Sequence, residues 1–246
     1  MPKTLITGAA SGIGRATAEL LASKGDALVL VDLFDLREVL PSHTDIVRIR
    51  GDVSDEAVWR DNQHRFEGLT HAVVNAGVSS GGMIDELDFA EWRRVMTVNL
   101  DGSFLTLRAA LRAIKQSSGP RSIVVTASVS GMKAESGVAA YGASKAAVIQ
   151  LARVAAKEVA AEGIRVNAIA PGGVDTPIWD GLPFFEQLIA SEGSREAAIE
   201  AMARMATPLG RYASAEEIAA QVAFLLSNEA ATITGAVLTS DGGYSL

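Results

Sequence analysis

The sequence TGAASGIG occupies residues 7–14, directly after a short apolar run and before a helix-favouring stretch. Glycine lets a chain turn sharply and lets backbone N–H groups come close to a phosphate. The helix predicted over residues 12–24 adds the positive end of its dipole at this turn. We therefore predict that the turn binds the pyrophosphate of a dinucleotide through Gly8, Ser11, Gly12, Ile13 and Gly14.

Outward from this turn, short apolar runs alternate with helical patterns along the whole chain. Most runs are continuously apolar, which is typical of strands buried on both faces of a parallel sheet. The alternation predicts an α/β fold: a Rossmann-type, doubly wound parallel sheet of about seven strands with helices on both faces, in one domain over residues 1–246. The predicted strands are 3–8, 27–32, 45–53, 71–77, 122–128, 164–172 and 236–243.

The predicted helices cover residues 12–24, 54–67, 88–116, 141–162 and 214–227. SAEE at 214–217 has the pattern of a capping box, and DFAE at 88–91 resembles one. Residues 173–212 show no clear pattern and are predicted to be irregular.

The composition excludes several classes of function. Nearly half of the 246 residues are apolar, and the formal net charge is −7, which disfavours nucleic acid or an anionic membrane as a partner. The chain has no cysteine, and His43, His64 and His71 are scattered, so no metal site is predicted. No signal peptide or membrane-spanning run is visible, and a cytoplasmic protein is expected.

Asp32 stands at the end of the second predicted strand. A carboxylate there can accept hydrogen bonds from both ribose hydroxyls of an adenosine and repels a 2′-phosphate. Asp32, followed by Leu33, therefore favours NAD over NADP, although Arg15 and Arg37 are near enough in sequence to reach a phosphate.

Asp52 and Val53 end the third predicted strand. They fit a hydrogen bond to adenine and an apolar wall beside it. They fit equally well an ordinary turn in which Ser54 caps the next helix.

YGASK at residues 141–145 places Tyr141 and Lys145 four residues apart, on one face of a helix. A nearby ammonium favours the phenolate and lowers the pKa of a tyrosine. We therefore expect Lys145, helped by the positive ring of a bound nicotinamide and by the helix dipole, to make Tyr141 a general acid/base. Ser128, at the end of the fifth predicted strand, is positioned to hold a substrate carbonyl. Asn99 lies inside an apolar helix, where its amide either holds a proton-relaying water or satisfies a helix kink.

These elements, in this order, resemble the classical short-chain dehydrogenase/reductase family along essentially the whole chain. The resemblance implies an NAD(P)-dependent oxidoreductase with Tyr141 as acid/base, Lys145 on the nicotinamide ribose, Ser128 on the carbonyl and Asn99 in the relay. It also implies that two segments line the cofactor. They are NAG, with Asn75, Ala76 and Gly77, and PGGVDT, with Pro171, Gly172, Val174 and Thr176. Gly173 departs from the larger residue usual in the family and is expected to leave its loop looser.

By position, the substrate pocket is expected to include Met132, Lys133, Val138 and Trp179. Residues 173–212 fit either a lid over an apolar substrate or a packed surface loop with ordinary helices. Arg195 and Arg204 either bind an anionic substrate or lie on solvated helix faces. The helices 88–116 and 141–162 are expected to form a homodimer or homotetramer, as the resemblance also implies.

The leading interpretation is an NAD-dependent dehydrogenase or reductase that acts on a small-molecule alcohol or ketone. One alternative is a 3-oxoacyl-thioester reductase that uses NADPH, which usually has a basic residue near Asp32 or Ser11. A second alternative is a non-catalytic NAD-sensing module, which is expected to have lost the tyrosine, lysine or serine.

Overall fold

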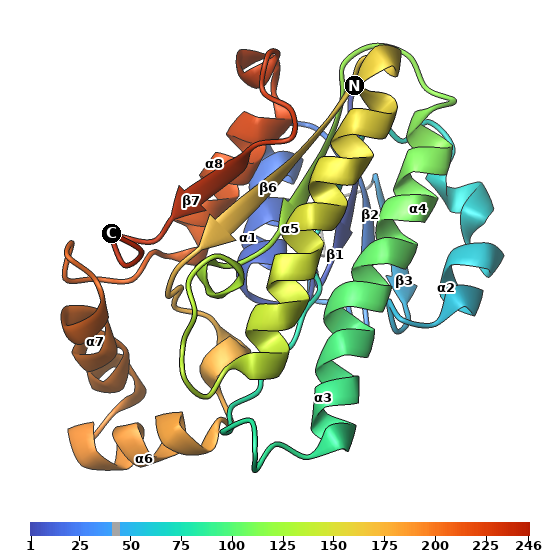
Figure 1. The fold of residues 1–246 in the computed structure, drawn as a ribbon. Coiled ribbons are helices and arrows are strands. Elements are labelled where there is room, and N and C mark those ends of the chain that lie inside the picture. The colour runs from blue at the N-terminus through green and yellow to red at the C-terminus, as the bar shows by residue number, and fades with distance from the viewer. Residues whose placement is uncertain (41–44) are drawn as a thin grey trace.

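Seven parallel strands form one sheet in the computed structural model, which describes residues 1–40 and 45–246 (Figure 1). The spatial order is β3-β2-β1-β4-β5-β6-β7. The predicted fold class is therefore confirmed, with seven strands as expected. The strands are β1 (Lys3–Thr7), β2 (Ala27–Asp32), β3 (Ile46–Arg50), β4 (His71–Val74), β5 (Arg121–Thr126), β6 (Ile164–Pro171) and β7 (Val237–Ser240).

Helices cover both faces of the sheet. On one face lie α1 (Gly12–Ser23) and α8 (Ala215–Leu226), which pack against each other. On the other face, α4 (Gly102–Ile114) and α5 (Ala139–Val159) run side by side in front of the sheet in Figure 1. Beside α4 lie α2 (Glu56–Asp61) and the 3-10 turn η1 (Gln63–Phe66).

The continuous apolar runs form both layers of the core, because neighbouring strand residues point to opposite faces. Leu5 belongs to the cluster under α4 and α5, whereas Ile6 belongs to the cluster under α1 and α8. Val29 likewise belongs to the first cluster and Leu30 to the second, and all four side chains are fully buried. Each such side chain contributes about 1.5–3 kcal/mol on burial, so the sheet needs helices on both sides to be stable.

The predicted helix 88–116 is one helical segment with a defect near its middle. It consists of α3 (Phe89–Met96), a π-helical turn η2 (Thr97–Asp101) and α4. Asp88 caps the start by accepting a hydrogen bond from the backbone N–H of Ala90. Glu91 bonds Arg94 instead of completing a capping box. At α8, by contrast, the predicted box between Ser214 and Glu217 is complete.

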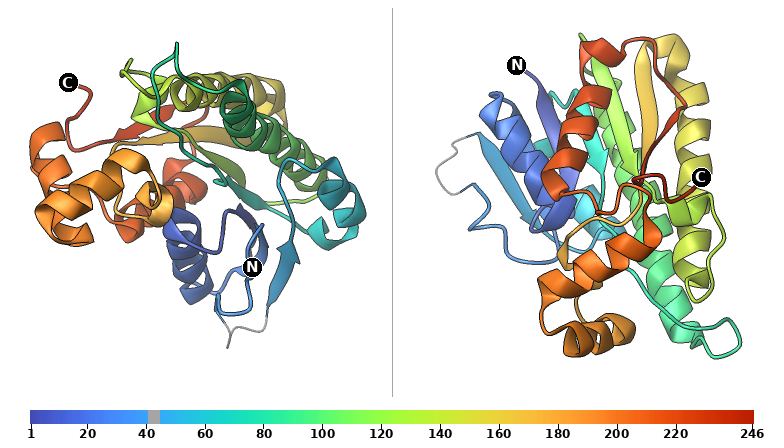
Figure 2. Two further views of the ribbon diagram at one scale, coloured as in Figure 1. Left: turned by 90° about the horizontal axis from the view of Figure 1, so that it is seen from below. Right: turned by 90° about the vertical axis from the view of Figure 1, so that its left-hand side faces the viewer.

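Residues 173–212 are more ordered than the sequence predicts. They contain a 3-10 turn η5 (Pro177–Trp179) and two helices, α6 (Pro183–Glu192) and α7 (Arg195–Ala206). The helices share a small apolar cluster that includes Phe185 and Ile199. The views in Figures 1 and 2 place α6 and α7 beyond the carboxyl end of β6, apart from the sheet. The prediction of an irregular segment is therefore wrong for most of this region. The alternative of a packed segment with ordinary helices is the better description, because α6 and α7 bury apolar side chains against each other.

The remaining differences are at element ends. The third strand stops at Arg50, so Asp52 and Val53 lie in the following loop. The 3-10 turns η3 (Val129–Gly131), η4 (Ala160–Glu162) and η6 (Asn228–Ala230) extend or connect longer elements. His43 lies outside the described residues. Within the described residues, no helix is both long and apolar enough to cross a membrane.

Candidate active site

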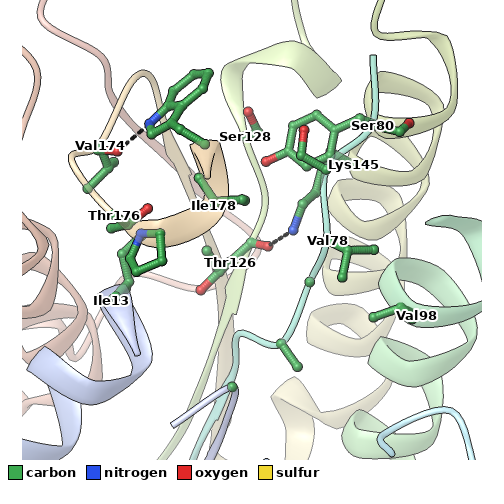
Figure 3. Close-up of a pocket in the computed structure, with 18 of the residues that line it drawn as sticks. Ile13, Val78, Ser80, Val98, Thr126, Ser128, Lys145, Val174, Thr176 and Ile178 are labelled. Atoms are coloured by element: carbon green, nitrogen blue, oxygen red, sulfur yellow. Dashed lines mark hydrogen bonds between the residues drawn. The ribbon is translucent and has the colours of Figure 1, made fainter. Parts of the chain in front are cut away.

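A large cavity opens along the carboxyl ends of the strands, where parallel sheets bind ligands. Its volume is about 1000 Å³, and we call it the main cavity. At one end it is lined by Ser11, Gly12 and Asp32, and at the other by Ser128, Tyr141 and Trp179. Figure 3 shows Ile13 and Thr176 on one side of the cavity and Lys145 and Val78 on the other. The topology thus unites residues that are far apart in the sequence.

The glycine-rich turn leaves the start of α1 free for a ligand. Ser11 precedes α1 with extended backbone angles, and its side chain makes no capping hydrogen bond. Ser11, Gly12 and Ile13 line the main cavity, so uncapped N–H groups and the helix dipole meet there. Gly14 does not line the cavity and acts by packing, since a Cβ on it would lie 2.0 Å from the Gly8 carbonyl oxygen.

Asp32 lines the same end of the cavity and also fixes the turn. Its Oδ2 accepts a hydrogen bond from the backbone N–H of Ala10 at 2.8 Å, and its Oδ1 accepts one from that of Phe34 at 2.9 Å. A carboxylate can accept more than one hydrogen bond on each oxygen, so both retain capacity for ribose hydroxyls. Leu33 lies beside Asp32 in the cavity wall.

The two arginines that could have reached a 2′-phosphate are bound to carboxylates. Arg15 pairs with Glu19 at 2.8 Å, and Arg37 pairs with Asp35 at 2.6 Å. Neither arginine lines the main cavity.

Asp52 and Val53 line the main cavity, although they lie beyond the third strand. The Asp52 carboxylate accepts hydrogen bonds from the backbone N–H and the hydroxyl of Ser54. The predicted cap at Ser54 is wrong, because Asp55 caps α2. Both interpretations of this segment are therefore partly right: it is a turn, and it forms part of the cavity wall.

The NAG segment ties the central strands together. The backbone N–H groups of Asn75 and Ala76 donate to the Thr7 hydroxyl, and the Asn75 amide donates to the Thr7 carbonyl. Asn75, Ala76 and Gly77 all line the cavity, as expected. The cavity is also lined by the predicted residues of the PGGVDT segment: Pro171, Gly172, Val174 and Thr176.

Ser128, Tyr141 and Lys145 meet at the other end of the cavity. Ser128 follows β5, whereas Tyr141 and Lys145 lie on one face of α5. The Ser128 hydroxyl is a hydrogen-bond partner of the Tyr141 phenol. The Lys145 ammonium lies 5.7 Å from the centre of the Tyr141 ring and donates a hydrogen bond to the Thr126 carbonyl at 2.8 Å (Figure 3).

The pKa of the phenol differs from the expectation. Burial raises the pKa of Tyr141, the hydrogen bond with Ser128 lowers it, and the negative charge of Glu135 raises it, with a net shift upward. Burial lowers the pKa of Lys145 to about 8. Lys145 alone does not lower the pKa of Tyr141, because the ammonium is directed to Thr126 and desolvation of the phenol dominates. Tyr141 is therefore a protonated phenol at neutral pH.

Asn99 lies in the π-helical turn η2 and is fully buried. Its Oδ1 accepts from the Val78 N–H at 2.8 Å, and its Nδ2 donates to the Val78 carbonyl and the Ser144 hydroxyl. The amide thus fastens the segment after NAG to α5, next to Lys145. A π-helical turn often occurs at a functional site, and this one directs the amide inward. Of the two expected roles, the side-chain contacts favour the structural one.

At the substrate end, Trp179 lines the cavity, as predicted. Its indole N–H donates to the Val174 carbonyl at 2.8 Å, and its ring stacks on Tyr212 with the centres 6.0 Å apart. The Tyr212 ring fills the space that a side chain at Gly173 would occupy, because a Cβ there would lie 2.3 Å from the ring. The expectation of a looser loop at Gly173 is therefore wrong: the glycine makes room for Tyr212.

Three of the four predicted pocket residues do not line the main cavity. They are Met132, Lys133 and Val138. Met132 is 53 % exposed, and the Lys133 ammonium donates to the Tyr244 carbonyl at 2.7 Å. The charged residue of this loop that lines the cavity is Glu135.

Arg195 and Arg204 do not line the cavity either. Arg195 pairs with Asp175 at 2.6 Å and with Asp180 at 3.0 Å, so it joins the start of α7 to the segment after β6. Arg204 is paired with Glu200 on its own helix. The alternative of a solvated helix face thus describes Arg204, whereas Arg195 connects two segments through its ion pairs.

The sequence analysis missed several cavity residues: Val78, Ser80, Glu91, Arg94, Glu135, Ile178, Tyr212 and Tyr244. One signal was available. The chain has only three tyrosines, and all three line the main cavity. Tyr212 and Tyr244 come from segments whose contact with the fifth strand end follows only from the folded chain.

Comparison with known proteins agrees with this geometry. A family model described as enoyl-(acyl carrier protein) reductase matches residues 8–245. The chain is 39 % identical to cis-4-hydroxycyclohexanecarboxylate dehydrogenase of Sinomonas cyclohexanicum, over 98 % of this chain and 95 % of that protein. It is 36 % identical to a 3-oxoacyl-(acyl-carrier-protein) reductase of Thermotoga maritima, over 97 % and 96 %. The ligand-free aldohexose dehydrogenase of Thermoplasma acidophilum has a TM-score of 0.87 at 31 % identity, over 99 % and 94 %.

Proposed function

The chain belongs to the classical short-chain dehydrogenase/reductase family, and on that premise we propose that it transfers a hydride between NAD and a secondary alcohol or ketone. One observation carries the proposal. The uncapped glycine-rich turn and Asp32 line one end of a cavity, and Ser128, Tyr141 and Lys145 line the other. A dinucleotide has a matching distribution of chemical groups, with phosphates and adenosine at one end and the reactive ring at the other.

The residues at hand fit the cofactor. The N–H groups at the start of α1 would bind the pyrophosphate, and Asp32 would accept from the adenosine ribose. Asp52, Val53 and the NAG segment would line the adenine and the inner ribose. Lys145 would bind the nicotinamide ribose, and the segment from Pro171 to Thr176 would lie along the ring.

When bound, the nicotinamide supplies the hydride acceptor or donor, which no protein side chain provides. Ser128 would hold the substrate oxygen against Tyr141. In alcohol oxidation, the carbinol carbon loses a hydride with its two electrons and the hydroxyl proton passes to Tyr141 Oη. In ketone reduction, the carbonyl carbon gains the hydride and Tyr141 donates the proton. Since burial raises the pKa of Tyr141, the phenol is ready as an acid at neutral pH and serves as a base only where it ionises.

Two alternatives have less support. One alternative is a 3-oxoacyl-thioester reductase using NADPH, and one relative is a 3-oxoacyl-(acyl-carrier-protein) reductase. In this chain, however, Arg15 and Arg37 are paired with carboxylates away from the cavity. A non-catalytic NAD-sensing module does not need Ser128, Tyr141 and Lys145 together, and this chain retains all three in one cavity.

We also propose that the protein assembles as a homodimer or homotetramer through α4 and α5. These helices lie side by side on one face in Figure 1, and Phe104 on α4 and Val154 on α5 are 47 % and 43 % exposed. A partner subunit would cover these apolar side chains. A monomer in sedimentation experiments at micromolar concentration would contradict this assembly.

The proposal is tested by mixing the protein with NAD⁺ or NADP⁺ and a panel of secondary alcohols while the absorbance of the reduced cofactor is recorded. We expect turnover with NAD⁺, and a kcat/KM for NAD⁺ above that for NADP⁺. Asp32→Asn removes the negative charge that repels a 2′-phosphate, so the NAD⁺-to-NADP⁺ ratio should fall about tenfold or more. Asp61→Asn, an exposed residue outside the cavity, is the control. No turnover with any alcohol argues against the function, and a wild-type preference for NADP⁺ argues against the role of Asp32.

A further inference from the structure

The charged residues that line the main cavity are nearly all bound to a partner. Arg94 makes two hydrogen bonds to Glu91, and Asp180 pairs with Arg195. Glu135 differs from these, because no lysine or arginine in the described part of the chain forms an ion pair with it. Glu135 therefore brings to the substrate end of the cavity a carboxylate that no ion pair within the described residues neutralises.

The Glu135 carboxylate is held in place by the segment after β7. Tyr244 donates a hydrogen bond from its hydroxyl to Glu135 Oε1. Lys133 fixes Tyr244 in turn, since its ammonium donates to the Tyr244 carbonyl at 2.7 Å and lies 4.0 Å from the ring centre. The carboxylate of Asp241 accepts hydrogen bonds from two backbone N–H groups and closes the turn that carries Tyr244. A carboxylate fixed in this way can discriminate between substrates.

Glu135 also lies close to the reacting end of the cavity. Its charge contributes to raising the pKa of Tyr141 on α5, Tyr212 before α8 and Tyr244, after burial, which is the larger cause for all three. Among the residues described, Tyr244 is thus hydrogen-bonded to Glu135, Lys133 lies over the Tyr244 ring, and the charge of Glu135 reaches Tyr141 and Tyr212. A substrate bound at Tyr141 therefore lies in the same cavity as this carboxylate and the other two phenols.

We propose that Glu135 determines substrate specificity: its carboxylate accepts a hydrogen bond from a second hydroxyl of an uncharged, hydroxyl-bearing substrate and excludes substrates that carry a carboxylate there. The inference rests on the proposed function. A fixed carboxylate prefers a hydroxyl donor, because charge-assisted hydrogen bonds are the stronger kind, and it repels a second anion in a partly desolvated site. The neighbouring phenols supply further hydroxyl partners, and the ring of Trp179 provides an apolar wall.

The test uses three alcohols that share one ring: cyclohexane-1,4-diol, cyclohexanol and 4-hydroxycyclohexanecarboxylate. For the wild-type enzyme we expect the highest kcat/KM with the diol and the lowest with the carboxylate. Glu135→Gln keeps an acceptor for Tyr244 but removes the charge. It should raise the carboxylate-to-diol ratio of kcat/KM by about tenfold or more, because like charges no longer meet.

The pH profile gives a second readout that a purely structural role would not move. Without the negative charge the pKa of Tyr141 falls, so alcohol oxidation by Glu135→Gln should reach its plateau at lower pH than in the wild type. Glu216→Gln, which changes net charge equally at an exposed position outside the cavity, should leave the ratio and the profile unchanged. Tyr244→Phe removes the hydrogen bond that holds Glu135 but keeps the charge, so it should discriminate against the anion more strongly than Glu135→Gln does.

Several outcomes would overturn the proposal. They are a wild-type preference for the carboxylate, a wild-type preference for cyclohexanol over the diol, or an unchanged ratio in Glu135→Gln. Admission of the carboxylate by Tyr244→Phe instead would show that shape, not charge, selects the substrate. These results all require turnover, so they are distinct from failure of the proposed function, in which the wild type oxidises no alcohol.

Discussion

Replacing Tyr141 by phenylalanine is expected to lower kcat for alcohol oxidation by about 10²–10⁴-fold, the range typical of a lost general acid/base. The change removes only the hydroxyl that exchanges a proton with the substrate oxygen. The ring remains in the cavity wall, so NAD⁺ binding should be largely intact when measured by quenching of protein fluorescence. Steady-state rates with the best alcohol of the panel, at saturating NAD⁺, measure the effect.

Tyr244→Phe is the matched control for this experiment. It deletes a hydroxyl from the same cavity but away from the reacting bond, and it should retain far more of the wild-type kcat. Near wild-type turnover in Tyr141→Phe would refute the assignment of Tyr141.

Gly14→Ala is expected to produce the largest loss of stability among single-methyl changes at the glycine-rich turn. The added Cβ would lie 2.0 Å from the Gly8 carbonyl oxygen and 2.7 Å from the Asn75 amide nitrogen, so the start of α1 must move away from β1. We expect a loss of about 3 kcal/mol, at the upper end of the usual cost of overpacking. For a chain of this size, Tm would fall by roughly 6–12 °C in a thermal melt.

Gly81→Ala is the control for this change. The nearest atom to its added Cβ lies 4.0 Å away, and its backbone is not in the left-handed region. Its stability should stay within about 0.5 kcal/mol of the wild type. Equal Tm values for Gly14→Ala and the wild type would show that α1 does not approach β1 as closely as described.

The sheet and its order of elements could be predicted because the signals are local. Continuous apolar runs such as ALVLVD at 27–32 match strands buried on two faces, and the glycine-rich turn marks the entry to α1. The capping box at Ser214 likewise depends only on a stretch of four residues. The cavity residues at strand ends follow from the same pattern, since parallel strands place their carboxyl ends together.

What could not be predicted depends on long-range contacts. Glu135 and Tyr244 are far apart in the sequence, and only the path of the segment after β7 brings them together. The order within residues 173–212 depends on Trp179 stacking on Tyr212, which itself requires the small residue Gly173. The upward shift in the pKa of Tyr141 depends on burial, whereas the sequence displays only the neighbouring charge of Lys145.

Because burial raises the pKa of Tyr141, the mechanism depends on the electrostatic effect of the bound cofactor on this phenol. Lys145 lies 5.7 Å from the Tyr141 ring and does not overcome burial by itself. For Tyr141 to serve as a base, the positive nicotinamide ring of NAD⁺ must add to the field of Lys145 and stabilise the phenolate.

Tyrosinate absorbance measured against pH, as the difference between the wild type and Tyr141→Phe, reports the ionisation of this phenol alone. Without cofactor, Tyr141 should ionise above the value of about 10 for a free tyrosine. With saturating NAD⁺, its pKa should fall by about one unit or more. An identical titration curve with and without NAD⁺ would contradict the account.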